Sequence, residues 1–456
     1  MKTIHAKSVL LPTGWAQDIT VTIALDGRID TVADAGSGAA AGATSVDILL
    51  PAPCNVHSHA FQRAMAGLSE QRGPVGRDSF WTWRQLMYRF LDRLTPEDIQ
   101  AITAQVQMEM LESGYAAVGE FHYLHHQPGG RLYDDLGELS NRICAAAEQT
   151  GIGLTLLPVL YQQGGVDGRD LGPGQIRFGN DPERFFELLD RAATAITSLP
   201  DDTVLGAAPH SLRAVTPEAL KMLAETTKGP LHMHLAEQVD EVSEIKAAYG
   251  ARPVQWLLDT QPPDVRWCLI HCTQMLPDET TALATTGAVA GLCPITEASL
   301  GDGIFDAERW LSGSGRMAIG SDSNIRISLT EELRQLEYSQ RLRDKGRAVL
   351  AEPGGSTARR LYDAAVSGGA QAMGRKSGAI ASGFYADLVA LDGDATDLIG
   401  RQGDTALDTW VFTAGNELVC DVWSAGRHMV QNGRHVFRHE ITQSYRDCLS
   451  RLAEVM

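Results

Sequence analysis

The chain has 456 residues, enough for one large barrel, which commonly takes roughly 250 residues, together with a smaller accessory domain. Hydrophobic residues make up 44% and charged residues 21%, a mixture that is typical of folded globular proteins and excludes extensive disorder. The formal net charge of −18 disfavours nonspecific binding to nucleic acid or to an anionic membrane, so an anionic substrate requires locally concentrated positive side chains.

Cysteine usage and hydropathy indicate a cellular compartment. The seven cysteines are scattered from Cys54 to Cys448, and their odd number does not fit a disulfide framework. The N-terminal segment MKTIHAKSVLLPTGWAQDIT lacks a long apolar region followed by a small-residue cleavage site, and no later stretch is apolar enough to span a bilayer. We therefore expect a cytoplasmic protein that does not bind membranes.

The two ends of the chain have the same sequence pattern. Residues 2–50 contain short alternating runs, such as DITVTIAL and RIDTVAD, separated by glycine and aspartate turns, and segments 378–394 and 417–437 look the same. Short alternating runs with such turns are typical of antiparallel strands. We expect residues 1–50 and 378–456 to form one small composite β-sandwich, and residues 51–377 to form a separate domain.

Between these ends, eight apolar segments that terminate in polar residues alternate with helical patterns. The segments are 49–59, 116–121, 153–161, 203–210, 230–237, 266–272, 288–294 and 316–322. Continuous apolar strands alternating with helices indicate a parallel sheet covered on both faces, and eight such units predict closure into a barrel. The predicted fold class is α/β, a distorted (β/α)₈ TIM-like barrel with the small β-sandwich beside it.

Several of the intervening helices have recognisable start signals. Thr95 is a suitable cap, Pro96 suits the first helical position, and apolar residues follow at helical spacing until Gly114. The same signal recurs at Thr216, and a similar one begins at Pro277. These helices support the alternation of strands and helices.

Histidines and carboxylates collect where the predicted strands end. His57 and His59 lie two residues apart at the end of the first segment, so both imidazoles project from one strand face and can reach one metal ion. The fifth, sixth and eighth segments end with further residues of these types: His234, Glu237, His271 and Asp322. Barrel active sites assemble at the C-terminal strand ends, so this convergence predicts a metal site.

One position in this set stays open. His232 alternates with His234 in the fifth segment, and either residue could be a hydrogen-bonded core histidine and not a ligand. Residue types alone do not decide between them.

These motifs resemble the amidohydrolase superfamily, and specifically its cytosine-deaminase-like branch. The HxH at 57–59, the HxxE at 234–237, His271 and the SD pair at 321–322 occur in the expected order, and an SGxxADLVxLD run follows at 382–392. The spacing of His234 to Glu237 in this pattern favours His234 over His232. The segments NVHSHAFQRAMAGL, FWTWRQLMYRF and GEFHYLHH further resemble the bacterial N-formimino-L-glutamate deiminases.

The resemblance implies one mononuclear Zn²⁺ site, with Fe²⁺ or another divalent metal also compatible with the ligand types. Its ligands would be His57, His59, His234 and Asp322. Such a site leaves a position for water, whose pKa falls from about 15.7 to about 7. No second metal is implied, because Pro209-His210 stands where a bridging lysine is expected. A homodimer is also implied.

Three residues are expected to carry the proton chemistry. Asp322 is the expected base that accepts the proton of the attacking water, and His271 orients the hydroxide or stabilises charge on the tetrahedral intermediate. Glu237 carries a proton to the departing nitrogen. Without the family pattern, Glu237 could equally be a solvated carboxylate at a helix start.

The implied substrate is a small dicarboxylate, and planar guanidinium groups bind carboxylates bidentately. Arg84 and Arg213 follow the first and fourth segments and are the expected carboxylate ligands. By resemblance, three further residues add directional hydrogen bonds: Gln62, Tyr123 and His210.

Structural roles compete with these expectations. Arg63 and Arg84 could be solvated loop charges, and Trp81 and Trp83 are expected to pack within the same loop.

Three functions compete. We favour hydrolysis of N-formimino-L-glutamate to N-formyl-L-glutamate and ammonia, a step of histidine degradation. The alternatives are a deaminase of a heteroaromatic base such as guanine, and a metal- or ligand-binding module without catalysis. The paired arginines favour the first function, and the joint presence of Glu237, His271 and Asp322 argues against the third.

Overall fold

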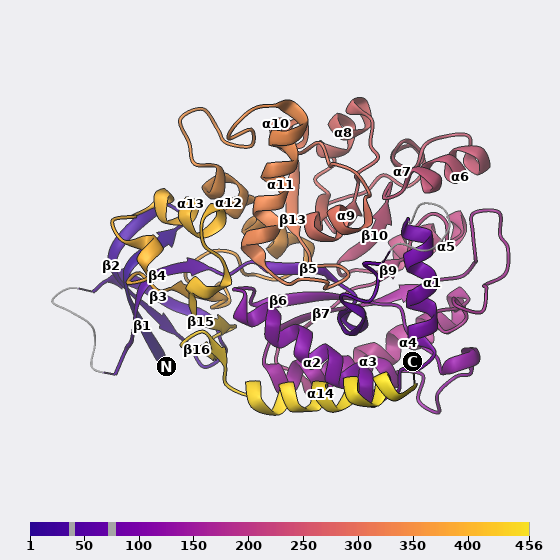
Figure 1. The fold of residues 1–456 in the computed structure, drawn as a ribbon, viewed down its shortest axis with the longest axis horizontal. Coiled ribbons are helices and arrows are strands. Elements are labelled where there is room, and N and C mark those ends of the chain that lie inside the picture. Colours follow the sequence, from indigo (N-terminus) through magenta and orange to yellow (C-terminus); the bar gives the residue numbers. More distant parts are fainter. Residues whose placement is uncertain (36–41, 72–78, 456) are drawn as a thin grey trace.

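The computed structural model describes residues 1–35, 42–71 and 79–455, and it shows a strand-and-helix barrel beside a sheet built from both chain ends (Figure 1). The barrel strands are parallel and form two runs. The first run contains β5 (Cys54–Ser58), β6 (Ala117–His122), β7 (Gly153–Leu160), β8 (Val204–Leu205) and β9 (Ala208–Pro209), and the second contains β10 (Leu231–Leu235), β11 (Trp267–His271), β12 (Val289–Leu292) and β13 (Arg316–Ile319). Parallel bridges between Ala207 and Leu231 and between Ser58 and Asp322 join the two runs.

Each of the eight predicted segments contains at least one barrel strand, which confirms the predicted α/β fold class. The first segment is not one strand, however. Its beginning belongs to β4 (Thr44–Pro51) of the terminal sheet, and β5 starts only at Cys54. Pro51 and Pro53 lack backbone N–H groups, so a single hydrogen-bonded ladder does not continue through this stretch.

Helices cover the barrel strands. They are α2 (Pro96–Glu112), α3 (Glu138–Thr150), α4 (Pro182–Ala195), α5 (Pro217–Thr226), α6 (Val239–Tyr249), α7 (Pro253–Thr260), α8 (Pro277–Ala284), α9 (Pro294–Leu300), α10 (Ala307–Ser312), α11 (Leu329–Asp344) and α12 (Thr357–Ala372). The predicted caps are confirmed, because the Thr95 hydroxyl accepts from the Asp98 N–H at 3.3 Å and the Thr216 hydroxyl accepts from the Ala219 N–H at 3.3 Å.

Helix α1 (Phe80–Leu91) corrects the expectation of a loop around Trp81, Trp83 and Arg84. Ser79 precedes this helix in extended conformation, and its N–H donates to the Thr82 hydroxyl at 3.0 Å. This reciprocal cap starts the helix, and buried Met87 and Phe90 hold it against the barrel. Helical spacing therefore decides which of its side chains reach the barrel mouth.

The terminal sheet joins both chain ends in one continuous order, β17-β16-β15-β14-β4-β1-β2-β3. Its remaining strands are β1 (Lys2–Leu11), β2 (Gly14–Ile23), β3 (Ile29–Asp34), β14 (Leu388–Leu391), β15 (Val419–Ser424), β16 (Arg427–Gln431) and β17 (Arg434–His435). The antiparallel pairing of β14 with β4 links the two ends. The same C-terminal region also contains helices α13 (Asp404–Phe412) and α14 (Arg438–Val455), and α14 lies along α2 (Figure 1).

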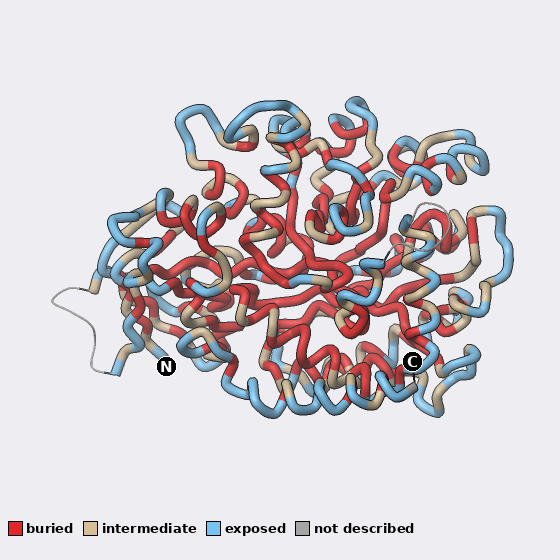
Figure 2. The backbone as a smooth tube through the Cα atoms, viewed as in Figure 1, coloured by how far each residue is buried: buried red, intermediate tan, exposed pale blue. Residues whose placement is uncertain are grey.

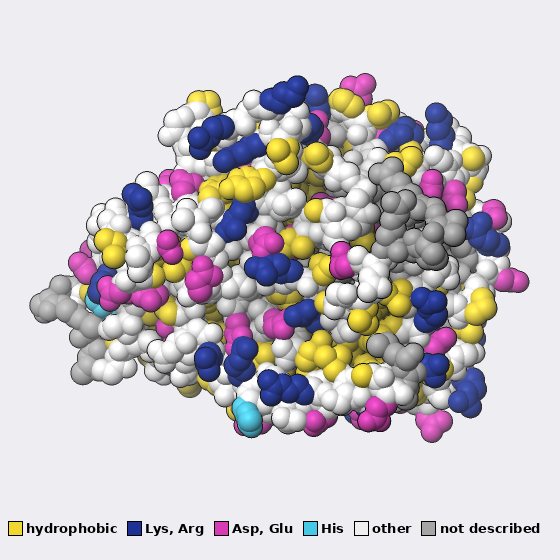
Figure 3. Space-filling view, in the orientation of Figure 1, with side chains coloured by type: hydrophobic (Ala, Val, Ile, Leu, Met, Phe, Trp, Pro, Cys, Tyr) yellow, Lys and Arg dark blue, Asp and Glu magenta, His cyan; other side chains and the backbone are white. Residues whose placement is uncertain are grey.

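Buried residues run along the barrel strands and the inner part of the terminal sheet, whereas the outer helices are half exposed (Figure 2). The sheet has its own apolar cluster, which includes Ile4, Val21, Leu49 and Leu388. Charged side chains of both signs are interspersed over the face in Figure 3. None of the described helices is both long and apolar enough to cross a membrane.

Candidate active site

The C-terminal ends of the barrel strands present the predicted site residues. His57 lies in β5, His234 in β10 and His271 at the end of β11, while Asp322 lies three residues beyond β13. The backbone adopts positive φ at His271 (70°) and Asp322 (46°), a region that non-glycine residues seldom occupy. Such strain persists where the surrounding structure enforces it, which is a frequent property of functional sites.

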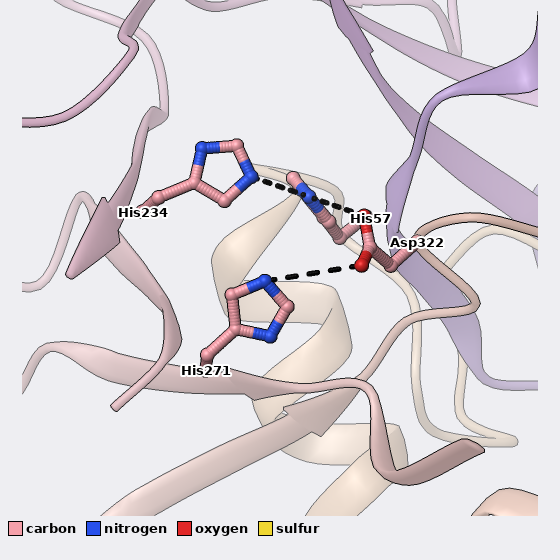
Figure 4. A group of neighbouring side chains, drawn as sticks. All are labelled: His57, His234, His271 and Asp322. Carbon is pink, nitrogen blue, oxygen red and sulfur yellow. Dashed lines mark hydrogen bonds and ion pairs between the residues drawn. The ribbon is translucent and has the colours of Figure 1, made fainter. Parts of the chain in front are cut away.

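Five of these side chains meet in one buried cluster (Figure 4 shows four of them). His57 Nε2 lies 3.1 Å from His234 Nε2 and 3.3 Å from Asp322 Oδ1. His59 Nε2 lies 3.2 Å from Asp322 Oδ1, and His271 Nε2 lies 3.8 Å from Asp322 Oδ2. The ligand atoms of His57, His234, His271 and Asp322 are all within 4.8 Å of one another, and His59 borders this group through Asp322.

Hydrogen bonds at the far side of the rings orient two of the histidines. His59 Nδ1 donates to the Phe121 carbonyl at 3.1 Å, and His234 Nδ1 donates to the His210 carbonyl at 3.1 Å. A carbonyl oxygen only accepts, so Nδ1 carries the proton of each neutral ring and Nε2 keeps a lone pair. Both lone pairs face the cluster, which is the arrangement in which histidines bind metal ions.

The electrostatics of the cluster also fit a divalent cation. Burial lowers the pKa of His57 to about 3, despite the opposing hydrogen bond to Asp322, and burial likewise lowers the pKa of His59 and His234. Burial would raise the pKa of Asp322, but the hydrogen bond from His57 and the nearby histidines hold it well below its usual range. Neutral imidazoles beside an ionised carboxylate are the ligand forms that metals require.

His232 does not join this group. It lies two residues earlier on β10, and its Nε2 donates to the Ala372 carbonyl at 2.8 Å. The structure therefore brings His234, and not His232, to the cluster.

Glu237 and His271 lie together beside the cluster. Glu237 Oε1 is 3.9 Å from His271 Nε2, and His271 Nδ1 donates to Glu297 Oε1 at 3.2 Å. Burial would lower the pKa of His271, but Glu237, Glu297 and Asp322 raise it to about 10. The carboxylates around His271 therefore favour its protonated form, unlike the three histidines described above.

A cavity opens onto this cluster, and every predicted site residue except His57 lines it. The predicted residues in its wall are His59, Gln62, Arg84, Tyr123, His210, Arg213, His234, Glu237, His271 and Asp322. The wall is otherwise largely apolar, with Phe80, Trp83, Met87, Phe178 and Leu300. Such a mixture of apolar wall and few polar groups is usual for small-molecule sites.

Arg84 and Arg213 supply positive charge to this cavity. Among the described residues, no carboxylate lies within 4.0 Å of either guanidinium group, and the buried Nε of Arg213 has no hydrogen-bond partner. The Trp81 ring contacts both, with its centroid 5.7 Å from Arg84 Cζ and 5.5 Å from Arg213 Cζ. Arg63 differs, because it forms a bidentate pair with Glu109 at 2.7 and 3.2 Å.

The other predicted substrate residues lie close to these arginines. Gln62 Nε2 donates to the Tyr123 hydroxyl at 2.9 Å, while the buried Gln62 Oε1 has no partner among the described residues. Burial, with Arg213 and Arg84 nearby, holds the pKa of His210 well below its usual range. His210 is therefore neutral, and its Nδ1 lies 3.0 Å from the Ser211 hydroxyl.

Sequence reasoning missed several supporting residues. Glu297 orients His271, and Glu241 accepts from the backbone N–H groups of Ala236 at 3.2 Å and Glu237 at 2.9 Å. Tyr161 lines the cavity directly after β7. Its place at the end of the third predicted segment was an available signal, whereas Glu297 had none because α9 brings it to His271 only in the folded chain.

The barrel, with histidines and an aspartate converging at its C-terminal strand ends, defines the class of metal-dependent barrel hydrolases. The Amidohydrolase family model matches residues 48–429, and the model described as "Formimidoylglutamate deiminase HutF, N-terminal domain" matches residues 1–45. The chain therefore belongs to the amidohydrolase family and, within it, groups with the formimidoylglutamate deiminases, which confirms the predicted family resemblance.

Individual relatives support this placement. The formimidoylglutamate deiminase of Pseudomonas aeruginosa is 47% identical over 462 aligned residues, which cover 100% of both chains. The crystal structure of an amidohydrolase from Brucella melitensis superimposes with a TM-score of 0.94 at 45% identity, covering 99% of this chain and 100% of that one. An adenosine deaminase from Xanthomonas campestris with bound zinc shares the fold, with a TM-score of 0.82 at 22% identity and coverage of 99% and 98%.

Proposed function

We propose that this protein hydrolyses N-formimino-L-glutamate to N-formyl-L-glutamate and ammonia. The observation that carries the proposal is the pair Arg84 and Arg213. Their guanidinium groups have no carboxylate within 4.0 Å among the described residues, and both side chains lie in the wall of the cavity that meets the histidine cluster. The 47% identity to the Pseudomonas aeruginosa formimidoylglutamate deiminase supports the same activity. The enzyme is thus a hydrolase that acts on a C–N bond.

Substrate recognition is assigned to the side of the cavity that carries the arginines. The substrate has two carboxylates, and Arg84 and Arg213 each offer planar donors that match a carboxylate. Gln62, Tyr123 and His210 add uncharged hydrogen-bonding groups to the same wall. A neutral purine base would bring no negative charge to these two cations, so the arginines favour a dicarboxylate over guanine.

The metal is assigned to His57, His59, His234 and Asp322, with His271 beside them. We propose one zinc ion, because histidine nitrogen and carboxylate oxygen suit zinc and the Xanthomonas campestris relative binds it. When bound, a divalent cation supplies Lewis-acid chemistry that makes hydroxide available near neutral pH. A metal ligand needs a lone pair that points at the cation. The backbone hydrogen bonds of His59 and His234 orient their rings so that each Nε2 lone pair faces the cluster.

Proton transfer is assigned to three side chains. Asp322 accepts the proton of the attacking water, whose oxygen forms a bond to the formimino carbon. His271 Nε2 donates a hydrogen bond that stabilises charge at the reacting centre. Glu237 delivers a proton to the imino nitrogen as the carbon–oxygen bond forms, which leaves a tetrahedral carbon with a hydroxyl and an amino group. The proton that Asp322 accepted then passes to this amino nitrogen, the carbon–nitrogen bond breaks and ammonia leaves. The hydroxyl proton returns to Glu237 as the carbon becomes a formyl group.

The proposed assembly follows from the family resemblance, and the proposed compartment follows from cysteine usage and hydropathy. We propose a cytoplasmic homodimer in which residues 51–377 form the catalytic domain and residues 1–50 with 378–456 form the accessory domain. Light scattering on the purified protein would detect a mass near twice 49.3 kDa, and a monomer would contradict this.

The substrate assignment is tested by ammonia release from N-formimino-L-glutamate and from guanine. The native enzyme should hydrolyse the first and leave guanine largely unreacted. Arg84→Met and Arg213→Met should each lower kcat/KM roughly 10- to 150-fold, because each removes a charge-assisted contact. Metal content should stay unchanged. Faster turnover of guanine by the native enzyme, or full activity in the double variant, would overturn the proposal.

A further inference from the structure

Tyr161 is a polar residue of the cavity that the roles described above leave without a function. It follows β7 directly, so it lies at the C-terminal strand ends with the site residues. Its side chain is buried and lines the cavity, with its ring centroid 4.5 Å from that of His210. A phenol hydroxyl at this position can accept hydrogen bonds through its oxygen and can donate its proton.

The Tyr161 oxygen is already occupied as an acceptor. Arg84 Nη2 donates to it at 2.7 Å, and Gln175 Nε2 donates to it at 2.9 Å. The orientation of the Gln175 amide is fixed, because its Oε1 accepts from the Gly172 N–H at 2.9 Å. Since both neighbours are donors, neither can accept the hydroxyl proton.

The Tyr161 proton therefore has no acceptor among the residues that the structure describes. A buried donor without a partner is unfavourable, and native proteins seldom leave one unless a ligand or water completes it. Tyr161 lines the cavity together with Arg84, so a molecule bound there can supply the missing acceptor. Accepting a hydrogen bond from a cation also polarises the phenol and makes it a stronger donor.

We propose that Tyr161 is a specificity-determining residue that donates its hydroxyl proton to the same substrate carboxylate that Arg84 binds. This inference rests on the proposed function, because it requires a carboxylate substrate. Arg84 and Tyr161 then form one composite carboxylate subsite in which Gln175 fixes the phenol.

The test uses Tyr161→Phe, which removes the hydroxyl and keeps the ring, with three substrates. They are N-formimino-L-glutamate, 4-(formiminoamino)butyrate, which lacks the carboxylate next to the nitrogen, and N-formimino-2-aminobutyrate, which lacks the distal one. On the full substrate, KM should rise and kcat/KM should fall roughly 10- to 100-fold, with unchanged metal content. The loss should shrink to less than about 3-fold on one truncated substrate, and Arg84→Met should lose its effect on that same substrate.

A second measurement separates direct donation from a structural effect on Arg84. Tyr161→Phe should lower kcat/KM further in an Arg84→Met background, because the phenol still reaches the carboxylate there. Tyr362→Phe is the matched control, since it removes a buried hydroxyl that donates to the Pro51 carbonyl at 2.9 Å, and it should not alter kcat/KM.

Three outcomes would overturn the inference while leaving the proposed function intact: normal kcat/KM in Tyr161→Phe, equal losses on both truncated substrates, or no further loss in the Arg84→Met background. If the native enzyme fails to hydrolyse N-formimino-L-glutamate, the proposed function and the inference both fall.

Discussion

Arginines at two parts of the barrel differ in how their charge is balanced. Arg375 is fully buried between two carboxylates, with Nη2 at 3.1 Å from Asp202 and 3.0 Å from Asp387. Arg84 and Arg213 contact aromatic rings and a phenol but have no carboxylate within 4.0 Å among the described residues.

The balanced arginine ties the terminal sheet to the barrel. Asp387 directly precedes β14, and Asp202 lies just before β8 and also pairs with Arg427 of β16 at 2.7 Å. An arginine that is paired with carboxylates of its own chain, such as Arg375, stabilises the fold. An arginine without a close carboxylate, such as Arg84, can bind an anionic ligand. Changes at the cavity should therefore alter activity, and changes at the Arg375 network should alter stability.

The largest effect is expected at the histidine cluster. His57→Ala combined with His59→Ala removes two nitrogen donors, so metal stoichiometry should fall from near one to near zero and turnover should be lost. Metal analysis of the purified variant measures this directly. His232→Gln, outside the cluster, should keep its metal, and retention of one metal by the double variant would refute the ligand assignment.

Breaking the balanced network should reduce stability and spare catalysis. Arg375→Met leaves Asp202 and Asp387 buried without their shared cation, so the free energy of unfolding should fall by roughly 3–5 kcal/mol. Chemical denaturation measures the loss. Arg169→Met, which breaks an exposed pair with Asp167, should cost less than about 1 kcal/mol. Equal stability of both variants would contradict the structural role of Arg375.

Glu237→Gln should reduce catalysis and leave stability unchanged. It keeps the shape of the side chain but removes its proton transfer, so kcat should fall by about 10²-fold or more while metal content and unfolding free energy stay near native values. Steady-state kinetics with metal analysis provide the measurement, and the exposed Glu225→Gln on α5 serves as the control. Normal turnover would remove Glu237 from the mechanism.

The smallest effect concerns pH. Burial would raise the pKa of Asp202, but its hydrogen bonds and proximity to Arg427 and Arg375 lower it below its ordinary value of 3.8. An acid whose pKa falls on folding stabilises the protein above its unfolded pKa and loses that contribution as the pH drops through its folded pKa. The native protein should therefore be more stable than Asp202→Asn at neutral pH. Unfolding measured at decreasing pH should show this advantage shrinking below about pH 4, and a constant difference would argue against the charge network.

Much of the fold was predictable because hydrophobic period and strand ends are local properties. The eight apolar segments predicted the barrel strands, and the cap at Thr95 predicted the start of α2. The expectation of a loop around Trp81 was wrong, although Phe80, Trp83, Met87 and Phe90 recur at helical spacing. The break between β4 and β5 at Pro51 and Pro53 was not predicted either, because residues 49–59 were treated as one segment.

The sequence by itself determined which residues meet at the barrel mouth, because the C-terminal ends of neighbouring parallel strands share one edge and chain order assigns each motif to a strand. Tertiary structure alone decided the charge balance, since Arg375 and Asp202 are 173 residues apart and no local pattern pairs them. It also decided that the Tyr161 oxygen accepts from Arg84 and Gln175, whereas the choice of His234 over His232 already followed from the family pattern. Partners of buried polar groups depend on packing between distant elements, which sequence spacing does not encode.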